Sequence, residues 1–379
     1  MLEKAFTGSR LYWAFLAVLV CLIGLGACCY LWQFYVGLGL TGLSRDVPWG
    51  LYIAQFTFLV GVAASAVMVV LPYYLHDYRA FGRVVVLGEF LAIAAVTMCQ
   101  LFIFVDMGQP RRLINALLHP TPNSIIFWDI VALGGYLALN VVITRVTFGA
   151  EGKGVAPPWW IKPVIILSIP WAFSIHTVTA MLYSGLGARP FWLSAIMTPR
   201  CLASAFSAGP ALLILLCLLV RKLGRYDVGQ AAISKLGEII TYAMIGNVFF
   251  WGLELFTALY SAIPEHVHHF EYLFFGLEGK SRLILFSWTS QILAVVALAL
   301  LIVPAVRRIE PLLVIACIAV VGSIWLDKGL GMVVAGFVPS PLGHVTEYWP
   351  TLPELAISAG IYAIGALIVT LFYKMAIAV

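Results

Sequence analysis

The sequence predicts an all-α integral membrane protein with about ten transmembrane helices. Of its 379 residues, 63% are hydrophobic and only 10% are charged, whereas soluble domains average about 25% charged residues. The apolar residues come in blocks of about twenty, the length that a helix needs to cross a bilayer core of about 30 Å. Because these blocks are continuous and do not alternate with polar residues, they predict helices and exclude a membrane β-barrel.

Gly, Pro and charged residues separate ten such blocks. The first block follows the basic residues Lys4 and Arg10. It is longer than a secretory signal and ends in no small-x-small cleavage site, so we expect it to be retained as a membrane span. The ten predicted spans are 11–34, 51–75, 84–106, 125–146, 161–185, 203–221, 237–262, 281–303, 310–327 and 354–378.

The distribution of Lys and Arg predicts the orientation of these spans, because cytoplasmic loops carry an excess of positive charge. Fourteen of the 22 basic residues lie on the side that holds both termini and the short loops. We therefore expect a multi-pass protein of the cell (inner) membrane with both termini in the cytoplasm. The opposite, outer side holds long loops rich in Pro, Trp and Tyr, at 35–50, 107–124, 186–202, 263–280 and 328–353.

The order of the spans predicts one polytopic membrane domain, 1–379, built from two similar halves. Spans two to five (approximately 45–185) and spans six to nine (approximately 203–330) each begin at an outer loop. This arrangement predicts two four-helix bundles of the same orientation, with the first and tenth spans beside them.

Ionisable residues within the spans are candidates for function, because charge is costly in the bilayer core. These candidates are Glu89, Asp106, Asp129, His176, Glu238, Glu254, Arg282, Asp327 and Glu354. Most of them lie toward the outer face. Structural alternatives stay open: a residue at a span edge is often only interfacial, Asp129 suits a helix N-terminus, and Glu254 suits an ion pair with Arg282.

One face of the fifth span predicts a quinone site. His176 lies well inside this span, and Thr179 and Tyr183 follow it at i+3 and i+7 on the same helical face. The two carbonyl oxygens of a quinone accept hydrogen bonds, and its reduction consumes two protons. A neutral histidine, a tyrosine hydroxyl and a carboxylate supply both needs, so we expect His176 to act as a ligand or proton carrier.

Other cofactors have no matching sequence pattern. A b-type haem usually needs two histidines on facing helices, and the spans contain one. The seven cysteines form no C-x-x-C pair, and the histidines at 266, 268 and 269 are more typical of a solvated segment than of a metal site. Nucleotide-binding and hydrolase motifs and basic nucleic-acid-binding stretches are also absent. We expect no haem, iron–sulfur cluster or metal in this chain, so its electron chemistry would need partner subunits.

A set of short motifs, in order, resembles the NrfD-type (polysulfide-reductase-like, PsrC) membrane subunits over nearly the whole chain. The motifs lie at 45–52 (RDVPWGLY), 72–77 (PYYLHD), 106–110 (DMGQP), 119–124 (HPTPNS), 127–129 (FWD), 176–180 (HTVTA), 188–192 (ARPFW) and 346–354 (TEYWPTLPE). Within that family the chain resembles the ten-span branch that includes DsrP of the DsrMKJOP complex and HmcC, which work in sulfate respiration.

The resemblance implies a menaquinone-handling subunit that docks a ferredoxin-like iron–sulfur subunit on its outer face. It also implies a quinone in the first four-helix bundle near that face. In complexes of the Dsr type the other partners are a multihaem cytochrome c, a b-haem membrane subunit and a cytoplasmic iron–sulfur subunit. Surrounding lipids complete the expected environment.

The leading hypothesis is therefore a subunit that is non-catalytic alone and exchanges electrons between menaquinone and redox partners, with proton movement as a further role. The expected quinone-binding residues are Trp49, Tyr52, Asp129, His176, Thr179 and Tyr183. The proton-transfer candidates are Glu89, Asp129, His176 and Glu254. A secondary transporter and a purely structural membrane anchor are the alternatives. A transporter more often has inverted repeats and a midplane site, and an anchor has no need of a buried histidine aligned with a tyrosine.

Overall fold

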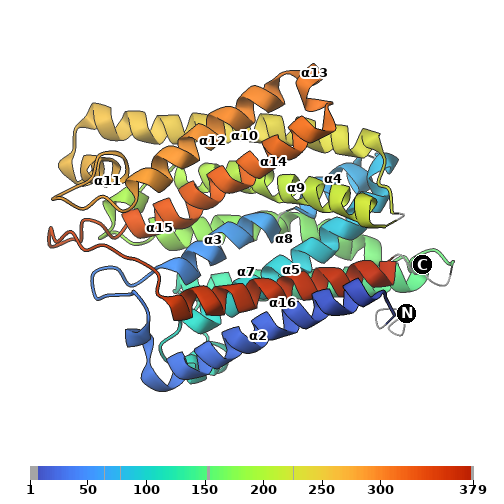
Figure 1. The fold of residues 1–379 in the computed structure, drawn as a ribbon, viewed down its shortest axis with the longest axis horizontal. Helices are drawn as coiled ribbons and strands as arrows, with labels where there is room; N and C mark the ends of the chain where they lie inside the picture. Colours follow the sequence, from blue (N-terminus) through green and yellow to red (C-terminus); the bar gives the residue numbers. More distant parts are fainter. Residues whose placement is uncertain (1–6, 64, 77, 152–153, 225, 377–379) are drawn as a thin grey trace.

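The structure is a computed structural model that describes residues 7–63, 65–76, 78–151, 154–224 and 226–376. Within these residues the chain is almost entirely helical and contains no β-strand (Figure 1). Ten of the described helical segments are long and apolar enough to cross a membrane, which confirms the predicted all-α membrane fold. The predicted end of the last span, residue 378, lies outside the described residues.

Eight of these segments consist of one long helix, which in the third segment is preceded by a short 3₁₀ turn at 79–81, and two are composite. The single helices are α2 (Arg10–Val36), α5 (Gly82–Asp106), α7 (Ile125–Glu151), α8 (Ile161–Ser184), α9 (Met197–Leu223), α10 (Gln230–Ser261), α12 (Ile284–Ile302) and α16 (Leu352–Ala376). The second span joins α3 (Leu51–Ala63) to α4 (Val67–Leu75). The ninth joins α14 (Glu310–Ile324), a π-helix η5 (Trp325–Gly331) and α15 (Met332–Ala335).

Short helices lie in the connections. They are η1 (Leu38–Leu40), η2 (Arg79–Phe81), η3 (Pro110–Ile114), α6 (Asn115–Leu118), η4 (Pro190–Trp192), α11 (Pro264–Phe274) and α13 (Pro304–Arg307). The start of α2 and the end of α16 lie at one end of the molecule, which we call the terminus side (Figure 1). The opposite end, the long-loop side, carries the connections at 37–50, 107–124, 185–196, 262–283 and 336–351.

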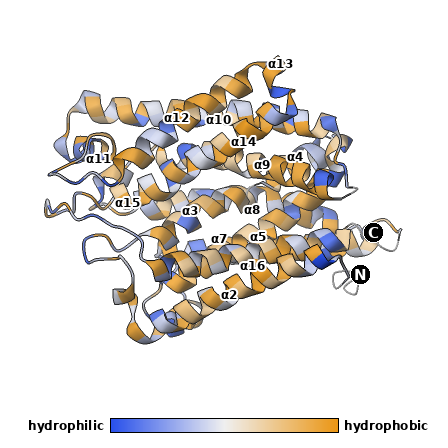
Figure 2. Cartoon of the chain, viewed as in Figure 1, coloured by the Kyte–Doolittle hydropathy of each residue, from blue (hydrophilic) through white to orange (hydrophobic). Residues whose placement is uncertain are grey.

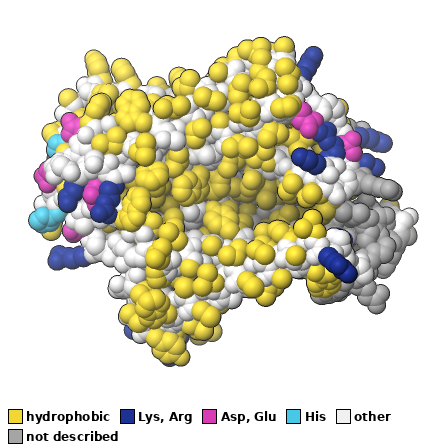
Figure 3. Space-filling model, in the orientation of Figure 1, with side chains coloured by type: hydrophobic (Ala, Val, Ile, Leu, Met, Phe, Trp, Pro, Cys, Tyr) yellow, Lys and Arg dark blue, Asp and Glu magenta, His cyan; other side chains and the backbone are white. Residues whose placement is uncertain are grey.

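The surface has the polarity expected of a membrane protein. Hydrophobic residues dominate the middle of the long helices, and hydrophilic residues gather toward the two ends (Figure 2). Lys, Arg, Asp, Glu and His side chains on the visible face are likewise confined to the ends, with a broad hydrophobic zone between them (Figure 3). The hydrocarbon layer therefore lies across the middle of the helices.

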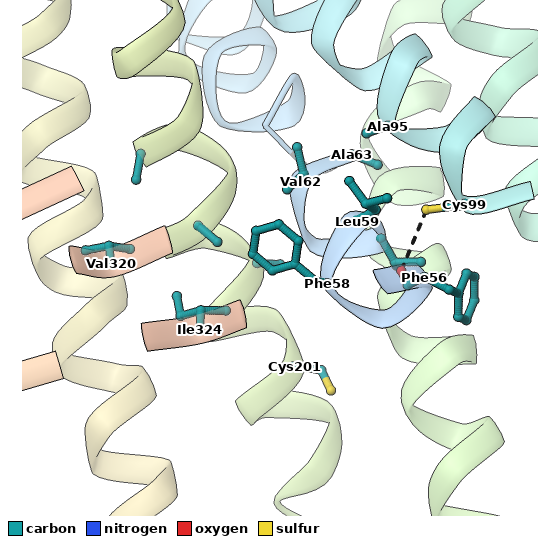
Figure 4. Close-up of a cluster of buried hydrophobic side chains, with 14 of the residues drawn as sticks. Phe56, Phe58, Leu59, Val62, Ala63, Ala95, Cys99, Cys201, Val320 and Ile324 are labelled. Carbon is teal, nitrogen blue, oxygen red and sulfur yellow. Dashed lines mark hydrogen bonds between the residues drawn. The ribbon is translucent and has the colours of Figure 1, made fainter. Parts of the chain in front are cut away.

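Helix α3 forms the centre of the molecule, and all its 13 residues are buried. It packs against α5, α9 and η5. Figure 4 shows apolar side chains of α3 meeting those of α5, α9 and α14. Phe58 and Leu59 of α3 contribute to this cluster, together with Cys201 of α9 and Ile324 of α14. Functional residues on α3 are consequently held by neighbours on every side.

The remaining spans pack around this centre in pairs. Helices α9, α10, α12 and α14 form a ring of neighbours, and α3, α5, α7 and α8 form another. Helix α9 of the first group also contacts α3 and α8 of the second group. The division of the two groups into separate bundles therefore stays a prediction. Helices α2 and α16 pack together beside α5, and a Cβ on Gly26 would lie 2.9 Å from Gly360 Cα. Small residues at such a crossing let two membrane helices approach closely.

Two predicted span boundaries are wrong on the long-loop side. Helix α9 begins at Met197, and the ninth span continues to Ala335, whereas 203 and 327 were predicted. Both extensions bring a basic residue, Arg200 and Lys328 respectively, into the buried interior. The sequence-based boundaries stopped short of these residues because an isolated charge normally ends a span.

Candidate functional site

Four aromatic side chains form a closed cluster at the long-loop side. Trp49 contacts Tyr183 at 5.6 Å between ring centroids, Tyr183 contacts Trp192 at 5.1 Å, and Trp192 contacts Phe337 at 4.9 Å. We call Trp49, Tyr183, Trp192 and Phe337 the aromatic cluster. The structure thus brings the predicted residues Trp49 and Tyr183 together, with two partners from the loops that follow α8 and α15.

Hydrogen bonds orient the members of the aromatic cluster. The Tyr183 hydroxyl donates to Thr57 Oγ1, since Thr57 itself donates to the Ile53 carbonyl at 2.7 Å. Trp192 Nε1 donates to the Met332 carbonyl at 2.9 Å. The Arg189 guanidinium lies 4.4 Å from the Phe337 ring centroid, a cation–π contact. Burial lowers the pKa of Arg189, and nearby Asp46 offsets part of this effect.

Asp129 and Thr179 form a second buried unit on the adjacent helices α7 and α8. Thr179 Oγ1 donates to Asp129 Oδ1 at 2.8 Å, and Asp129 is only 4% exposed. The first turn of α7 contains no acidic residue. Asp129 therefore lies too far along the helix for the macrodipole alone to explain it, because that effect fades within one turn.

His176 lies one turn before Thr179 and has an unusual environment. Its side chain is 1% exposed, and neither ring nitrogen has a hydrogen-bond partner among the described residues. A neutral imidazole carries one donor and one acceptor. Leaving both unpaired in a buried site is unfavourable, so such a group calls for an explanation. A ligand or a water that supplies the missing partners is the simplest one.

Tyr52 belongs to a different neighbourhood. Its hydroxyl donates to Gln33 Oε1 at 2.7 Å, and Gln33 Nε2 donates to the Val105 carbonyl at 2.7 Å. The buried Tyr30 hydroxyl and Asp106 Oδ1 have no partner among the described residues. Of the six residues predicted to line one pocket, Tyr52 thus faces α2 and forms no hydrogen bond with the other five.

A charged cluster connects the second group of helices to α3. Arg200 of α9 forms an ion pair with Glu254 of α10 and another with Asp327 of η5, the latter at 2.7 Å. Lys328 Nζ donates to the Cys201 carbonyl at 3.3 Å and lies against Gly61 of α3. We call Arg200, Glu254, Asp327 and Lys328 the charged cluster. Its two positive and two negative groups balance, and π-helical segments such as η5 often mark functional sites.

The predicted ion pair between Glu254 and Arg282 is wrong. Arg282 precedes α12 in an exposed loop and pairs with Glu347 at 3.3 Å, and its backbone N–H bonds the same carboxylate at 2.9 Å. Glu254 lies inside the membrane and needs a cation at its own depth, which Arg200 provides. Neither Arg200 nor Lys328 was selected from the sequence. The available signal was the presence of two unmatched carboxylates, Glu254 and Asp327, in neighbouring spans.

Glu89 lies at the bottom of a cavity that opens on the terminus side. The cavity has a volume of about 760 Å³, and Arg79, Arg83 and Tyr226 line its outer part. Thr144 Oγ1 donates to Glu89 Oε2 at 3.2 Å, and the carboxylate is 5% exposed. Deeper in the protein, Glu89 also borders a space of about 10 Å³ beside Tyr136, Asn140 and Ser168. A space of this size is comparable to that occupied by one water.

These sites define a helical membrane protein with ionisable side chains buried in both groups of helices. Within the described residues, no group of three His, Cys, Asp or Glu side chains is arranged to hold a metal ion. The chain belongs to the NrfD family of oxidoreductase membrane subunits, since the family described as "Polysulphide reductase, NrfD" matches residues 39–328.

Known relatives extend over most of the chain. A protein from Halobacterium salinarum, named as a membrane subunit of dimethyl sulfoxide reductase, is 26% identical over 94% of this chain and 89% of its own length. A selenate reductase subunit from Mesobacillus selenatarsenatis is 24% identical over 89% and 88%. The Hdr-like menaquinol oxidoreductase integral membrane subunit of Archaeoglobus fulgidus is 25% identical over 54% and 49%.

Proposed function

We propose that this chain is the quinone-site subunit of a respiratory redox complex and exchanges electrons between menaquinone and its partner subunits. The observation that carries the proposal is His176, which is buried near the long-loop side and whose two ring nitrogens have no hydrogen-bond partner among the described residues. Family membership supports it, and so does the similarity to a relative named as a menaquinol oxidoreductase membrane subunit.

The chemistry of His176 fits a quinone headgroup. The imidazole N–H donates to a quinone carbonyl, and the Asp129 carboxylate, held by Thr179, accepts or returns a proton. A bound quinone supplies two-electron, two-proton chemistry. The aromatic cluster encloses the headgroup and excludes water, with Tyr183 oriented through Thr57. Tyr183 and Trp192 are fully buried, so headgroup binding requires these side chains or the 185–196 loop to move.

Proton movement forms the second part of the proposal. The cavity beside Glu89 admits water from the terminus side. The polar side chains of Tyr136 and Asn140 border the small inner space next to Glu89 and extend the proton path toward the centre of the protein. Glu89 exchanges protons with this water. Glu254 performs the equivalent role in the second half of the chain, where its Oε1 has no hydrogen-bond partner within the described part of the chain.

The long-loop side is the proposed docking surface for redox partners. We propose that it faces outward and binds a ferredoxin-like iron–sulfur subunit, which passes electrons to or from a multihaem cytochrome c. The complex also includes a b-haem membrane subunit and a cytoplasmic iron–sulfur subunit, as in the Dsr-type assemblies. Both termini are then cytoplasmic, in the inner membrane.

Quinone analysis of the native complex, purified in mild detergent, tests the proposal. We expect about one menaquinone per chain, and loss of most of it in His176→Leu together with at least a tenfold fall in quinol oxidation. His344→Leu changes an exposed histidine on the same side and is the matched control. It should keep both the bound menaquinone and the rate of quinol oxidation. Stability in His176→Leu stays the same or rises, because the substitution removes two unpaired polar atoms.

Other outcomes separate the alternatives. Wild-type complex that retains iron–sulfur partners but no quinone indicates a membrane anchor. Complex with neither quinone nor redox partners overturns the proposal and favours a transporter.

A further inference from the structure

A second large cavity opens toward the lipid between the two halves of the protein. It has a volume of about 740 Å³ and is seen as a hydrophobic hollow in the middle of the face in Figure 3. Helices α2 and α16 border it on one side and α9 and α14 on the other, while α3 and α5 form its floor. None of the described residues that line it is charged. We call this cavity the lipid-facing groove.

One polar group interrupts the apolar floor of the groove. Gln55 of α3 is 4% exposed, and its Oε1 accepts hydrogen bonds from Trp325 Nε1 at 2.8 Å and from the Tyr362 hydroxyl. The indole N–H can only donate, so the amide atom that faces it must be the oxygen. The orientation of Gln55 is thereby fixed, and its NH₂ group is left without an acceptor among the described residues.

Gln55 and the aromatic cluster lie on different faces of α3. Thr57, which bonds Tyr183, follows Gln55 by two residues, and positions two apart on a helix point about 200° from one another. The groove is therefore separated from the region of Tyr183 by the thickness of one helix, about 10 Å. It is a distinct site that opens directly to the membrane.

We propose that the lipid-facing groove binds an isoprenoid quinone from the membrane, with a headgroup carbonyl accepting a hydrogen bond from the Gln55 amide. The isoprenoid tail follows Leu212, Leu216 and Leu219 of α9 toward the terminus side. This inference rests on the proposed function and adds a second, open quinone site to it. The cavity volume lies in the range that suits small-molecule sites.

The chemistry of Gln55 decides between a quinone and other occupants. A phospholipid keeps its headgroup at the membrane surface, so only acyl chains would reach Gln55 and its donors would stay unpaired. A partner helix has its backbone carbonyls already bonded internally. A quinone carries a hydrogen-bond acceptor on an otherwise apolar body. Its apolar body matches the apolar lining of the groove, and its carbonyl matches the Gln55 amide on the floor.

Photolabelling of the native complex in lipid nanodiscs tests this site. The probe is an azido-naphthoquinone with an isoprenoid tail, and labelled peptides are identified by mass spectrometry. We expect labels within 212–219 and 362–370, which line the groove, besides any labels near the aromatic cluster. Ala366→Phe fills the groove and reduces groove labelling at least tenfold. Ala299→Phe makes the same change at an exposed position of α12 and leaves labelling unchanged.

A second variant examines the hydrogen bond. Gln55→Leu lowers groove labelling about threefold to tenfold, the range that one lost hydrogen bond gives. Labelling near the aromatic cluster without any in the groove overturns this inference and leaves the proposed function intact. Groove labels that persist in Ala366→Phe overturn it as well, as does co-purification of a tightly bound phospholipid that excludes the probe. Absence of labels at both places counts against the proposed function itself.

Discussion

Arg200 determines the properties of the charged cluster at the scale of single residues. It is nearly fully buried and bonds two carboxylates, Glu254 and Asp327, from different helices. A buried ion pair stabilises a protein little relative to apolar residues of the same size, but removal of one partner leaves an uncompensated charge. The three residues therefore act as a unit, and Lys328 completes their charge balance.

Replacement of Arg200 tests this dependence. Arg200→Met leaves two carboxylates without their cation and is expected to destabilise the protein by about 3–5 kcal/mol. Arg282→Met removes an arginine that is 51% exposed, and its effect should stay below about 1 kcal/mol. Thermal unfolding of the detergent-solubilised complex measures both. Equal stabilities for the two variants would show that Glu254 and Asp327 are not held as charges by Arg200.

At the scale of elements, Glu354 links three segments of the long-loop side. It lies at the start of α16 and accepts hydrogen bonds from the backbone N–H of Thr351 at 2.8 Å and of Gly42 at 2.7 Å. The Tyr348 hydroxyl donates to its other oxygen at 2.7 Å and accepts from Leu51 N–H at 2.8 Å. The sequence Thr351-Leu352-Pro353-Glu354 thus works as one half of a capping box. The interfacial role considered for Glu354 is insufficient, since its side chain is completely buried.

Loss of this carboxylate should loosen the loops before the helices. Glu354→Ala leaves two backbone N–H groups and one hydroxyl without an acceptor, and we expect it to destabilise the long-loop side by about 2–4 kcal/mol. Hydrogen exchange should then increase within 41–51 and 346–351. Glu310→Gln, at a partly exposed position on the terminus side, serves as the control. Unchanged protection of both loops in Glu354→Ala would contradict this role.

Helix α11 depends on a single histidine in a similar way. His269 is 2% exposed, and its Nδ1–H is shared between the carbonyls of Ala335 at 2.7 Å and Val338 at 2.8 Å. Burial lowers the pKa of His269 to about 4, and these hydrogen bonds offset part of the effect. The charges of His266 and His268 lower it further.

The lowered pKa of His269 predicts that acidic pH releases helix α11 from the end of the ninth span. A histidine exposed by opening takes up a proton below pH 6.5, whereas docked His269 stays neutral until about pH 4. Docking is unaffected at neutral pH and weakens as the pH falls between these values, by about 2 kcal/mol at pH 5. Hydrogen exchange of 264–274, corrected for its intrinsic pH dependence, measures this. His269→Gln should abolish the difference between pH 7.5 and pH 5, and a wild type that is insensitive to pH would contradict the prediction.

The sequence predicts the helices well wherever the length of an apolar run is enough to identify a membrane span. All ten spans were located, because twenty apolar residues have few alternatives to a membrane helix. The boundaries at Arg200 and Lys328 failed because burial of each charge depends on residues more than fifty positions away. The composite nature of the ninth span was also missed, since nothing in its hydrophobicity distinguishes the π-helix η5 from an α-helix.

The candidate site was only partly predictable at the scale of the whole molecule. Helical spacing places His176, Thr179 and Tyr183 on one face of α8, and all three are buried. Their partners come from elsewhere: Trp192 and Phe337 lie in loops, and Tyr52 turns toward α2. A single sequence contains no information on which helices become neighbours, and for this reason the lipid-facing groove and the Glu89 cavity emerge only from the packing of the helices.

The orientation of the whole molecule is the prediction on which partner docking and proton uptake both depend. Ten described helical segments are long and apolar enough to cross the membrane, and an even number of crossings places the start of α2 and the end of α16 on the same side. The excess of Lys and Arg predicts that this side is cytoplasmic.

Lys222→Cys and Lys280→Cys place a thiol at exposed positions on the terminus side and the long-loop side, respectively. In intact spheroplasts, a membrane-impermeant maleimide should label Lys280→Cys and leave Lys222→Cys unlabelled. Inverted vesicles should give the opposite pattern, while the unsubstituted chain measures the background from its own cysteines. Labelling of Lys222→Cys from outside would place the Glu89 cavity in the external medium and the proposed docking surface for redox partners in the cytoplasm.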